Sequence, residues 1–253
     1  MRGISLFKEY FLGYEGNYVF IGGTACTVLF EEAGEVFRAT KDLDIVLIIE
    51  NINVDFVKQF WRFIHDGQYE EIYTSEDRGR FYRFVKPADS RFPYMIELFS
   101  RRPAEIILFP GTHLMPIHIA DEVSSLSAIL LDDDYYEFLL DGRKLVDGIP
   151  VLDELHLIAF KAKAWCDLSE RHQKGEEGLT RHIKKHRKDI AMLMSLVGSG
   201  VNTSINGVVM SDMKRFIEAM RSETLDVYTT GVAGMTTKRF VETLESFFNL
   251  TKA

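Results

Sequence analysis

The sequence predicts an α/β (α+β) fold in which a small mixed sheet with flanking helices is followed by a C-terminal helical lobe. Short β-rich segments separated by glycine and proline turns fill the chain up to about residue 150, whereas apolar residues recur at helical spacing from Asp153 onward. The 253 residues are enough for one domain with a smaller partner. We therefore expect two domains, 1–150 and 151–253.

The first predicted elements are a strand, a glycine turn and a helix. Residues 18–21 are β-rich and end at Gly22-Gly23, and residues 24–32 are typical of a helix. Residues 42–49 begin with alternating polar and apolar side chains and become continuously apolar, which indicates a strand buried on both faces. The chain thus opens with two strands and one intervening helix.

The next segments predict the rest of the sheet and a helix that covers it. Residues 54–65 have a helical apolar period that Gly67 ends. Strands are expected at 80–86 and 94–100, and the short connection between them favours antiparallel pairing next to the strand at 42–49. Further short strands are expected near 106–109 and 113–119.

A hairpin is predicted just before the helical lobe. Residues 135–140 and 143–146 lie on either side of Asp141-Gly142, a pair typical of hairpin turns, and Asp132–Asp134 is interpreted as a solvated loop before it. In the lobe itself, Asp153 is placed to cap a helix. Later helices are expected at 176–197, 211–221 and 236–249.

Charge and cysteine content narrow the function classes. The 38 acidic and 30 basic residues give a net charge of −8, which argues against unfocused adhesion to nucleic acid, although residues 171–188 form a local basic segment. Cys26 and Cys166 lack the spacing of a zinc site and are expected to be buried, inert thiols. Apolar runs are too short to cross a bilayer, so we expect a cytoplasmic protein with no membrane partner.

Three acidic residues predict a metal centre. Side chains alternate across a strand, so Asp42 and Asp44 lie on the same face, where two carboxylates repel each other unless a cation lies between them. Carboxylate oxygens on a rigid strand suit Mg²⁺. Glu97, on a strand expected to lie nearby, is available as a third ligand.

Gly22-Gly23 predicts a phosphate-binding turn beside these acids. At a junction of strand and helix, backbone N–H groups and the positive end of the helix dipole can approach an anion with no Cβ in the way. Three carboxylates, two Mg²⁺ ions and this turn together predict a site for in-line nucleotidyl transfer, with an NTP as the donor substrate.

The segments Phe20-Ile-Gly-Gly-Thr-Ala25 and Arg38-Ala-Thr-Lys-Asp-Leu-Asp-Ile-Val46 resemble the DNA polymerase β-like nucleotidyltransferase superfamily, and the second resembles its AbiEii-type, toxin-like branch. The resemblance covers residues 18–100. It implies that 1–150 is the catalytic domain, that Gly22, Gly23 and Thr24 contact the triphosphate, and that Asp42, Asp44 and Glu97 bind metal. Thr24 replaces the serine common in the family, and Arg38 and Lys41 are candidate phosphate or substrate contacts.

A fainter resemblance lies in the helical domain, where Leu157-Ile-Ala-Phe-Lys161-Ala-Lys163 and the later basic Lys-Asp motif look like the lysine and aspartate that complete the nucleotide pocket of this branch. Lys161 and Lys163 lie about 200° apart on a helix, so only one of them can face the pocket, and we choose Lys161. Asp189 would orient that lysine or a base. An ion pair with Lys185 or Lys188 is the structural alternative.

Three functions stay open at this point. The resemblance implies transfer of an NMP to a hydroxyl on RNA (tRNA-like) or protein, with an antitoxin partner if the protein is a toxin. A small-molecule (antibiotic-type) nucleotidyltransferase uses the same chemistry, and the acidic charge favours a cationic substrate. The third is a catalytically inactive module that binds a nucleotide or a partner.

Overall fold

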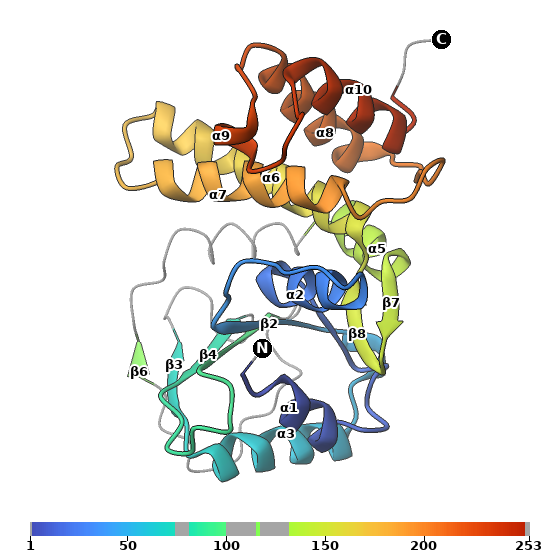
Figure 1. Ribbon diagram of the computed structural model, residues 1–253. Helices are drawn as coiled ribbons and strands as arrows, with labels where there is room; N and C mark the ends of the chain where they lie inside the picture. Colours follow the sequence, from blue (N-terminus) through green and yellow to red (C-terminus); the bar gives the residue numbers. More distant parts are fainter. Residues whose placement is uncertain (1, 74–80, 100–114, 117–131, 251–253) are drawn as a thin grey trace. The chain divides into compact units, whose positions relative to one another are not determined.

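The computed structural model describes residues 2–73, 81–99, 115–116 and 132–250 (Figure 1). The chain divides into two compact units, of which the first comprises Met1–Ile119 and Arg143–Leu152 and the second Ala120–Gly142 and Asp153–Ala253. The chain therefore passes between the units three times. The last passage, between Leu152 and Asp153, lies close to the boundary that the sequence predicts.

The first unit is built on a mixed sheet whose strand order is β6-β3-β4-β5-β2-β1-β8-β7 among the described residues. The strands are β1 (Tyr18–Phe20), β2 (Asp42–Leu47), β3 (Glu70–Tyr73), β4 (Phe81–Val85), β5 (Met95–Phe99), β6 (Met115–Pro116), β7 (Arg143–Val146) and β8 (Ile149–Leu152). Parallel pairs join β2 to β5, β1 to β8 and β3 to β6, and the other neighbours are antiparallel. The predicted mixed α/β fold is confirmed.

The central strands agree with their predictions. β4 and β5 pair antiparallel across a short connection, and β5 lies directly beside β2. Leu43, Ile45, Val46 and Leu47 of β2 are all buried, as expected of a strand covered on both faces. This central position places the two acids that open β2 next to β5 instead of at an edge of the sheet.

Helices cover both faces of this sheet. Helix α2 (Gly22–Glu32) lies on one face, and α1 (Ile4–Tyr10) and α3 (Val54–Gly67) lie on the other (Figure 1). On the second face the Phe7 ring lies 5.3 Å from that of Phe20 and 5.1 Å from that of Phe63, so an aromatic cluster joins both helices to β1. Even-numbered residues of β2, including both acids, face the α2 side.

The predicted hairpin is wrong, because residues 135–140 are helical. They belong to α5 (Asp133–Asp141), where Tyr135, Tyr136, Phe138 and Leu139 are buried at helical spacing. The loop predicted at Asp132–Asp134 is likewise wrong: Asp132 caps α5 by accepting from the Tyr135 N–H at 3.2 Å, and Asp134 accepts from the Val208 N–H at 2.7 Å.

The hairpin turn lies instead at the next Asp-Gly pair along the chain. Strand β7 pairs with β8 across Asp147-Gly148, whose φ angles of 47° and 71° suit a type I′ turn. The chain contains Asp-Gly at both 141–142 and 147–148, and the first pair ends a helix. Of the strands expected near 106–109 and 113–119, only Met115–Pro116 lies within the described residues.

The second unit is helical, as predicted. Its other helices are α6 (Glu154–Gln173), α7 (Thr180–Met194), α8 (Gly207–Arg221), α9 (Val227–Thr230) and α10 (Thr237–Phe247). Asp153 caps α6 by accepting from the His156 N–H at 2.9 Å. The rings of Trp165 and Phe216 lie 5.3 Å apart and those of Phe216 and Phe240 6.2 Å apart, which joins α6, α8 and α10 in one core.

Both cysteines are buried, which confirms the prediction. Burial raises the pKa of the Cys166 thiol to about 11, so this thiol is protonated at neutral pH and unreactive. Within the parts of the chain that the structure describes, no helix combines the length and the apolar character needed to cross a membrane.

Candidate functional site

The predicted acids lie together on one face of the sheet in the first unit. Asp44 of β2 pairs in register with Glu97 of β5, and Glu97 pairs with Arg83 of β4, so the three side chains form a row across neighbouring strands. Asp42 lies on the same face, two residues before Asp44. The sheet therefore brings three carboxyl groups and one guanidinium side by side.

The glycine turn meets this row directly. Gly22, with φ of +59°, lies so close to Asp44 that a Cβ at this position would come within 2.2 Å of the Asp44 Oδ2 atom. The Gly23 N–H donates to the same oxygen at 3.2 Å. The first turn of α2 thus directs its N–H groups, which have no carbonyl partner inside the helix, toward the carboxylates.

Gly23 is also required for space. A Cβ on Gly23 would lie 2.8 Å from the Oγ1 atom of Thr40, which precedes β2. Even a small side chain here would therefore displace Thr40.

Thr24 has a role that the sequence does not reveal. Its hydroxyl donates to the Asp42 carbonyl oxygen at 2.7 Å and accepts from the Asp44 N–H at 3.4 Å. The residue is fully buried. The hydroxyl therefore joins the start of α2 to the start of β2 and holds the turn against the acids.

The Asp44 carboxyl group lies in an unfavourable place for a negative charge. Burial raises its pKa well above the ordinary value, and the Glu97 charge, a hydrogen bond to Glu97 and the Asp42 charge act in the same direction. The hydrogen bond from the Gly23 N–H lowers the pKa but does not compensate. Burial and the neighbouring carboxyl groups therefore disfavour the charged form of Asp44.

Arg83 is a site residue that the sequence reasoning missed. Its Nε and Nη2 atoms donate to the Glu97 Oε1 atom at 2.9 and 2.5 Å, and both side chains are largely buried. A signal was present, because Arg83 is the one charged residue of the strand Phe81–Val85. The antiparallel pairing predicted for 80–86 and 94–100 would have placed it near Glu97.

The donor atoms of the site fit a hard divalent cation in kind. Asp42 and Asp44 supply carboxylate oxygens on one face of a rigid strand, and Glu97 supplies a third carboxylate. Among the described residues, however, no group of three or more acid, histidine or cysteine side chains is arranged to hold a metal ion. Glu97 is instead bound to Arg83.

Arg38 and Lys41 lie just before β2. The Arg38 guanidinium lies 5.0 Å from the centre of the Phe37 ring, and the Lys41 amine lies 5.7 Å from the centre of the Tyr94 ring. Lys41 is exposed and Arg38 partly so. Their role as phosphate contacts stays a prediction.

In the second unit, Lys161 and Asp189 form a buried ion pair. The Lys161 Nζ atom donates to Asp189 Oδ2 at 2.8 Å, and the residues are 5% and 1% exposed. Lys163 points elsewhere, with its Nζ atom 3.1 Å from Asp167 and 3.3 Å from Asp212. The expected link between Lys161 and Asp189 is therefore present. Both residues belong to the second unit, whereas the three acids belong to the first.

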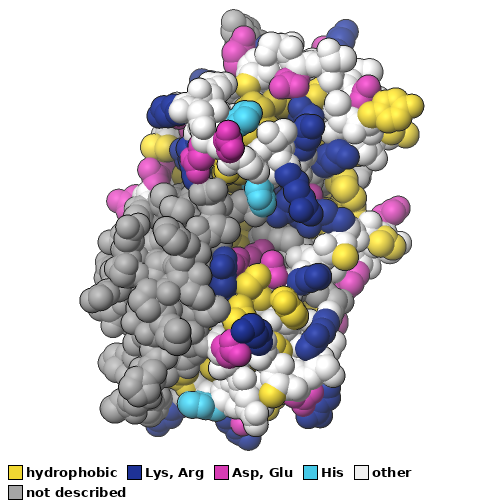
Figure 2. All heavy atoms as spheres, turned by 90° about the vertical axis from the view of Figure 1, so that its left-hand side faces the viewer, with side chains coloured by type: hydrophobic (Ala, Val, Ile, Leu, Met, Phe, Trp, Pro, Cys, Tyr) yellow, Lys and Arg dark blue, Asp and Glu magenta, His cyan; other side chains and the backbone are white. Residues whose placement is uncertain are grey.

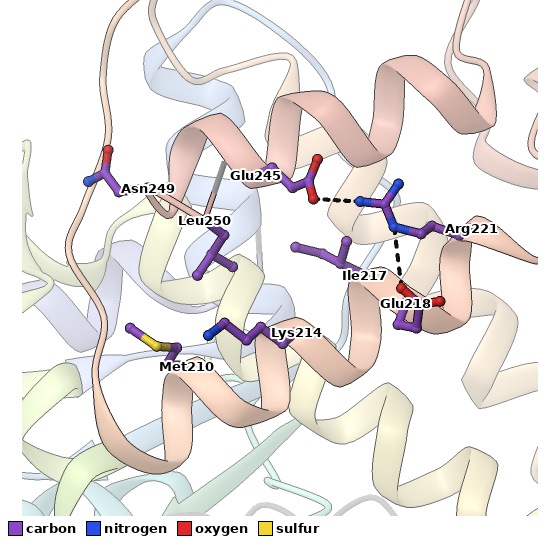
Figure 3. A pocket seen from close by; sticks show the side chains of 8 residues that line it. All are labelled: Met210, Lys214, Ile217, Glu218, Arg221, Glu245, Asn249 and Leu250. Atoms are coloured by element: carbon purple, nitrogen blue, oxygen red, sulfur yellow. Dashed lines mark hydrogen bonds and ion pairs between the residues drawn. The ribbon is translucent and has the colours of Figure 1, made fainter. Parts of the chain in front are cut away.

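A groove with a volume of about 910 Å³ lies between α8 and α10 in the second unit (Figure 3). Met210, Ile217 and Leu250 supply apolar walls, and Arg221 pairs with Glu245 at 2.5 Å and with Glu218 at 3.4 Å. None of the predicted site residues lines it. The charges inside the groove compensate each other, so it carries no functional assignment.

Comparisons with known proteins give one structural likeness. No family model matches the sequence, and no curated protein matches it. A solved structure of an antigenic nucleotidyltransferase-like protein from Paracoccidioides brasiliensis superposes on 85% of this chain and 86% of that chain, with 15% sequence identity and a TM-score of 0.46. At this distance, function has to be argued from the site itself.

The crowding of the acids predicts that Asp44→Asn stabilises the first unit in the absence of divalent ions. Asparagine can still accept from the Gly23 N–H and can donate to Glu97, but it carries no charge. A raised pKa means that the folded protein holds the proton more tightly than the unfolded chain, so wild-type stability falls as pH rises through that pKa. The advantage of the variant should grow over the same range and vanish below about pH 4.

Urea unfolding with EDTA measures this effect. Trp61 lies in the first unit and Trp165 in the second, so a Trp165→Phe background reports the first unit alone. We expect a gain on the order of 1 kcal/mol at pH 8, because one unit of pKa shift corresponds to about 1.4 kcal/mol. Asp89→Asn is the matched control: a hydrogen bond from Arg91 lowers the Asp89 pKa, so no gain is expected. A less stable Asp44→Asn variant would contradict the crowding.

The buried pair predicts non-additive effects in the second unit. Lys161→Met leaves the Asp189 carboxylate buried without its lysine partner and should cost about 3–5 kcal/mol of unfolding free energy. Adding Asp189→Leu should recover most of this loss. Unfolding is followed through Trp165 in a Trp61→Phe background, with Lys163→Met, at a more exposed pair, as the milder control. Additive losses in the double variant would show that the two residues are not coupled.

Proposed function

We propose that this protein is a metal-dependent nucleotidyltransferase that moves an NMP from an NTP to a hydroxyl acceptor. The observation that carries the proposal is the meeting of three carboxyl groups with a glycine turn at the start of a helix, on one face of the sheet. Carboxylates favour divalent cations and N–H groups at a helix start favour phosphate, so the two halves of a metal–triphosphate complex match adjacent halves of the site.

In this proposal Asp42, Asp44 and Glu97 bind two Mg²⁺ ions, which would lower the pKa of the attacking hydroxyl and offset charge on the triphosphate. The N–H groups of Gly22, Gly23 and Thr24 hold phosphate oxygens. Thr24 also keeps α2 and β2 in register through its hydroxyl. Arg38 and Lys41, just before β2, contact the triphosphate or the acceptor.

Lys161 and Asp189 complete the nucleotide pocket in this proposal. Asp189 holds the Lys161 amine through the 2.8 Å hydrogen bond, which orients it. The amine would contact the nucleotide in the assembled site. The pair is structural and functional at once, so its loss should reduce both stability and transfer.

A charge pattern on α7 favours an RNA (tRNA-like) acceptor. Arg181, Lys184 and Lys188 are exposed at a spacing of three and four residues, which places them on one face of the helix. In the described part of the chain none of the three has an ion-pair partner. Figure 2 shows Lys and Arg side chains on one face of the molecule. Such a stripe suits a phosphate backbone.

Other acceptors account less well for the basic residues of α7. A protein acceptor and a small hydroxylated molecule both suit the transfer chemistry, but neither explains three exposed cations on one face of α7 in an acidic protein. An inactive nucleotide- or partner-binding module would have no use for three adjacent carboxyl groups. If expression of the protein arrested cell growth, that result would support a toxin role with an antitoxin partner.

Thermal unfolding with Mg²⁺ and each of the four NTPs tests the donor half of the proposal. Wild type should be stabilised by Mg²⁺ with one or more NTPs, by about 2.7 kcal/mol when ligand exceeds Kd 100-fold. Asp42→Asn/Asp44→Asn should show no such response, and Asp89→Asn should respond like wild type. Release of pyrophosphate with label transfer to RNA then reports the reaction. If wild type responds to no metal–nucleotide pair, the catalytic proposal fails.

Salt dependence of RNA binding tests the acceptor half. Replacing Arg181, Lys184 and Lys188 with glutamine should weaken binding and reduce the slope of log K against log salt by about 2, since each phosphate contact contributes about 0.7 with single strands. The control replaces Lys58, Lys86 and Lys238, which are exposed cations with acidic partners. Equal slopes in the two triple variants would remove the support for RNA.

A further inference from the structure

Arg83 binds the third acid of the candidate site in a way that leaves little room for another cation. Both donating nitrogens, Nε at 2.9 Å and Nη2 at 2.5 Å, point at the same Glu97 oxygen, Oε1. A carboxylate oxygen has about two lone pairs, so this oxygen is saturated by the guanidinium. Glu97 also interacts with Asp44, its partner in the β2–β5 register.

The charge of Arg83 is permanent. A guanidinium stays protonated at every pH that a folded protein tolerates. The side chain is 17% exposed and that of Glu97 is 9% exposed, so water screens the pair weakly. A divalent ion that approached the three acids would therefore meet a fixed positive charge one strand away from Glu97.

We propose that Arg83 is a latch on the metal site: it holds Glu97 when no ion is bound, and the ion pair opens when a divalent cation takes Glu97 together with Asp42 and Asp44. This inference rests on the proposed function and concerns how its metal site is regulated. Arg83 is a positioning residue, since it acts through Glu97. The latch keeps affinity for a lone cation low, so that the site fills when the nucleotide supplies further negative charge.

The Arg83 guanidinium offsets part of the charge of three carboxyl groups that lie on one face of the sheet. The row Arg83, Glu97 and Asp44 is held by the guanidinium at one end and by the Gly23 N–H at the other. A residue that merely oriented a metal ligand would improve cation affinity. A latch lowers cation affinity, so the two roles predict opposite changes in cation affinity when Arg83 is replaced.

Binding of Mn²⁺ alone, followed by electron paramagnetic resonance, distinguishes these two roles. Arg83→Gln removes the competing charge and should bind Mn²⁺ at least about tenfold more tightly than wild type. Tenfold is about the effect of a unit charge about 6 Å from a divalent ion in a water-like medium, and weaker screening increases it. Arg83→Lys keeps the charge and should stay near wild type. Lys86→Gln removes an equal charge at an exposed position just after β4 and should change nothing.

A measurement on the wild type guards against a variant that fails to fold. The Arg83 Nε–H, assigned by its absence in Arg83→Lys, should give a slowly exchanging nitrogen–proton NMR signal because it is hydrogen-bonded and largely buried. Saturating Mg²⁺ should abolish that protection, since the pair opens. A signal that stays protected would overturn the latch.

The outcomes distinguish this inference from the proposed function. If wild type binds no Mn²⁺ even with an NTP, the metal-dependent function itself fails. If wild type binds Mn²⁺ and Arg83→Gln binds it equally or more weakly, the latch is wrong and the proposed function stands. Tighter binding in Arg83→Gln with loss of NMR protection in wild type supports both.

Discussion

The close approach of the Gly22 backbone to the Asp44 carboxyl group is the constraint on which the candidate site depends. With any side chain at residue 22, a Cβ would lie 2.2 Å from Asp44 Oδ2, and the left-handed φ of +59° would add strain. This contact fixes the start of α2 over β2, and the Thr24 hydroxyl secures it from the other side of the turn. The row from Asp44 through Glu97 to Arg83 then follows from strand register alone. The glycine thus sets how the helix start meets the row, and the strand register sets the row itself.

Much of the site was predictable because it obeys local rules. Alternation along β2 places Asp42 and Asp44 on one face, and a glycine pair after a strand predicts a backbone turn. The proximity of Glu97 needed only the pairing of two neighbouring segments. The Thr24 hydroxyl bonds were not predicted, because they depend on how the start of α2 meets the start of β2. Arg83 was missed although its strand was expected to pair with that of Glu97, because the pairing alone does not reveal the ion pair. Local pattern therefore finds the acids and tertiary contacts find what restrains them.

The fold shows the same division. Strands and helices with long apolar patterns were predicted correctly, whereas α5 was not. Its nine residues contain Tyr135, Tyr136 and Phe138, which favour strands, and they precede an Asp-Gly pair typical of hairpins. The cap from Asp132 and burial against α6, where the Tyr135 and Phe160 rings lie 5.3 Å apart, decide in favour of a helix. Of the two Asp-Gly pairs, the one at 147–148 makes the hairpin because it lies between two paired strands, β7 and β8.

The alternating path of the chain between the two units has a consequence for synthesis on the ribosome. Helix α5 belongs to the second unit, yet it is made before β7 and β8, which complete one side of the first unit's sheet. β1 therefore lacks its parallel neighbour β8 until part of the second unit has already emerged. Neither unit can finish folding as an uninterrupted stretch of nascent chain. Their folding is linked in time as well as in sequence, and a gene split near residue 150 would leave α5 stranded on the wrong fragment.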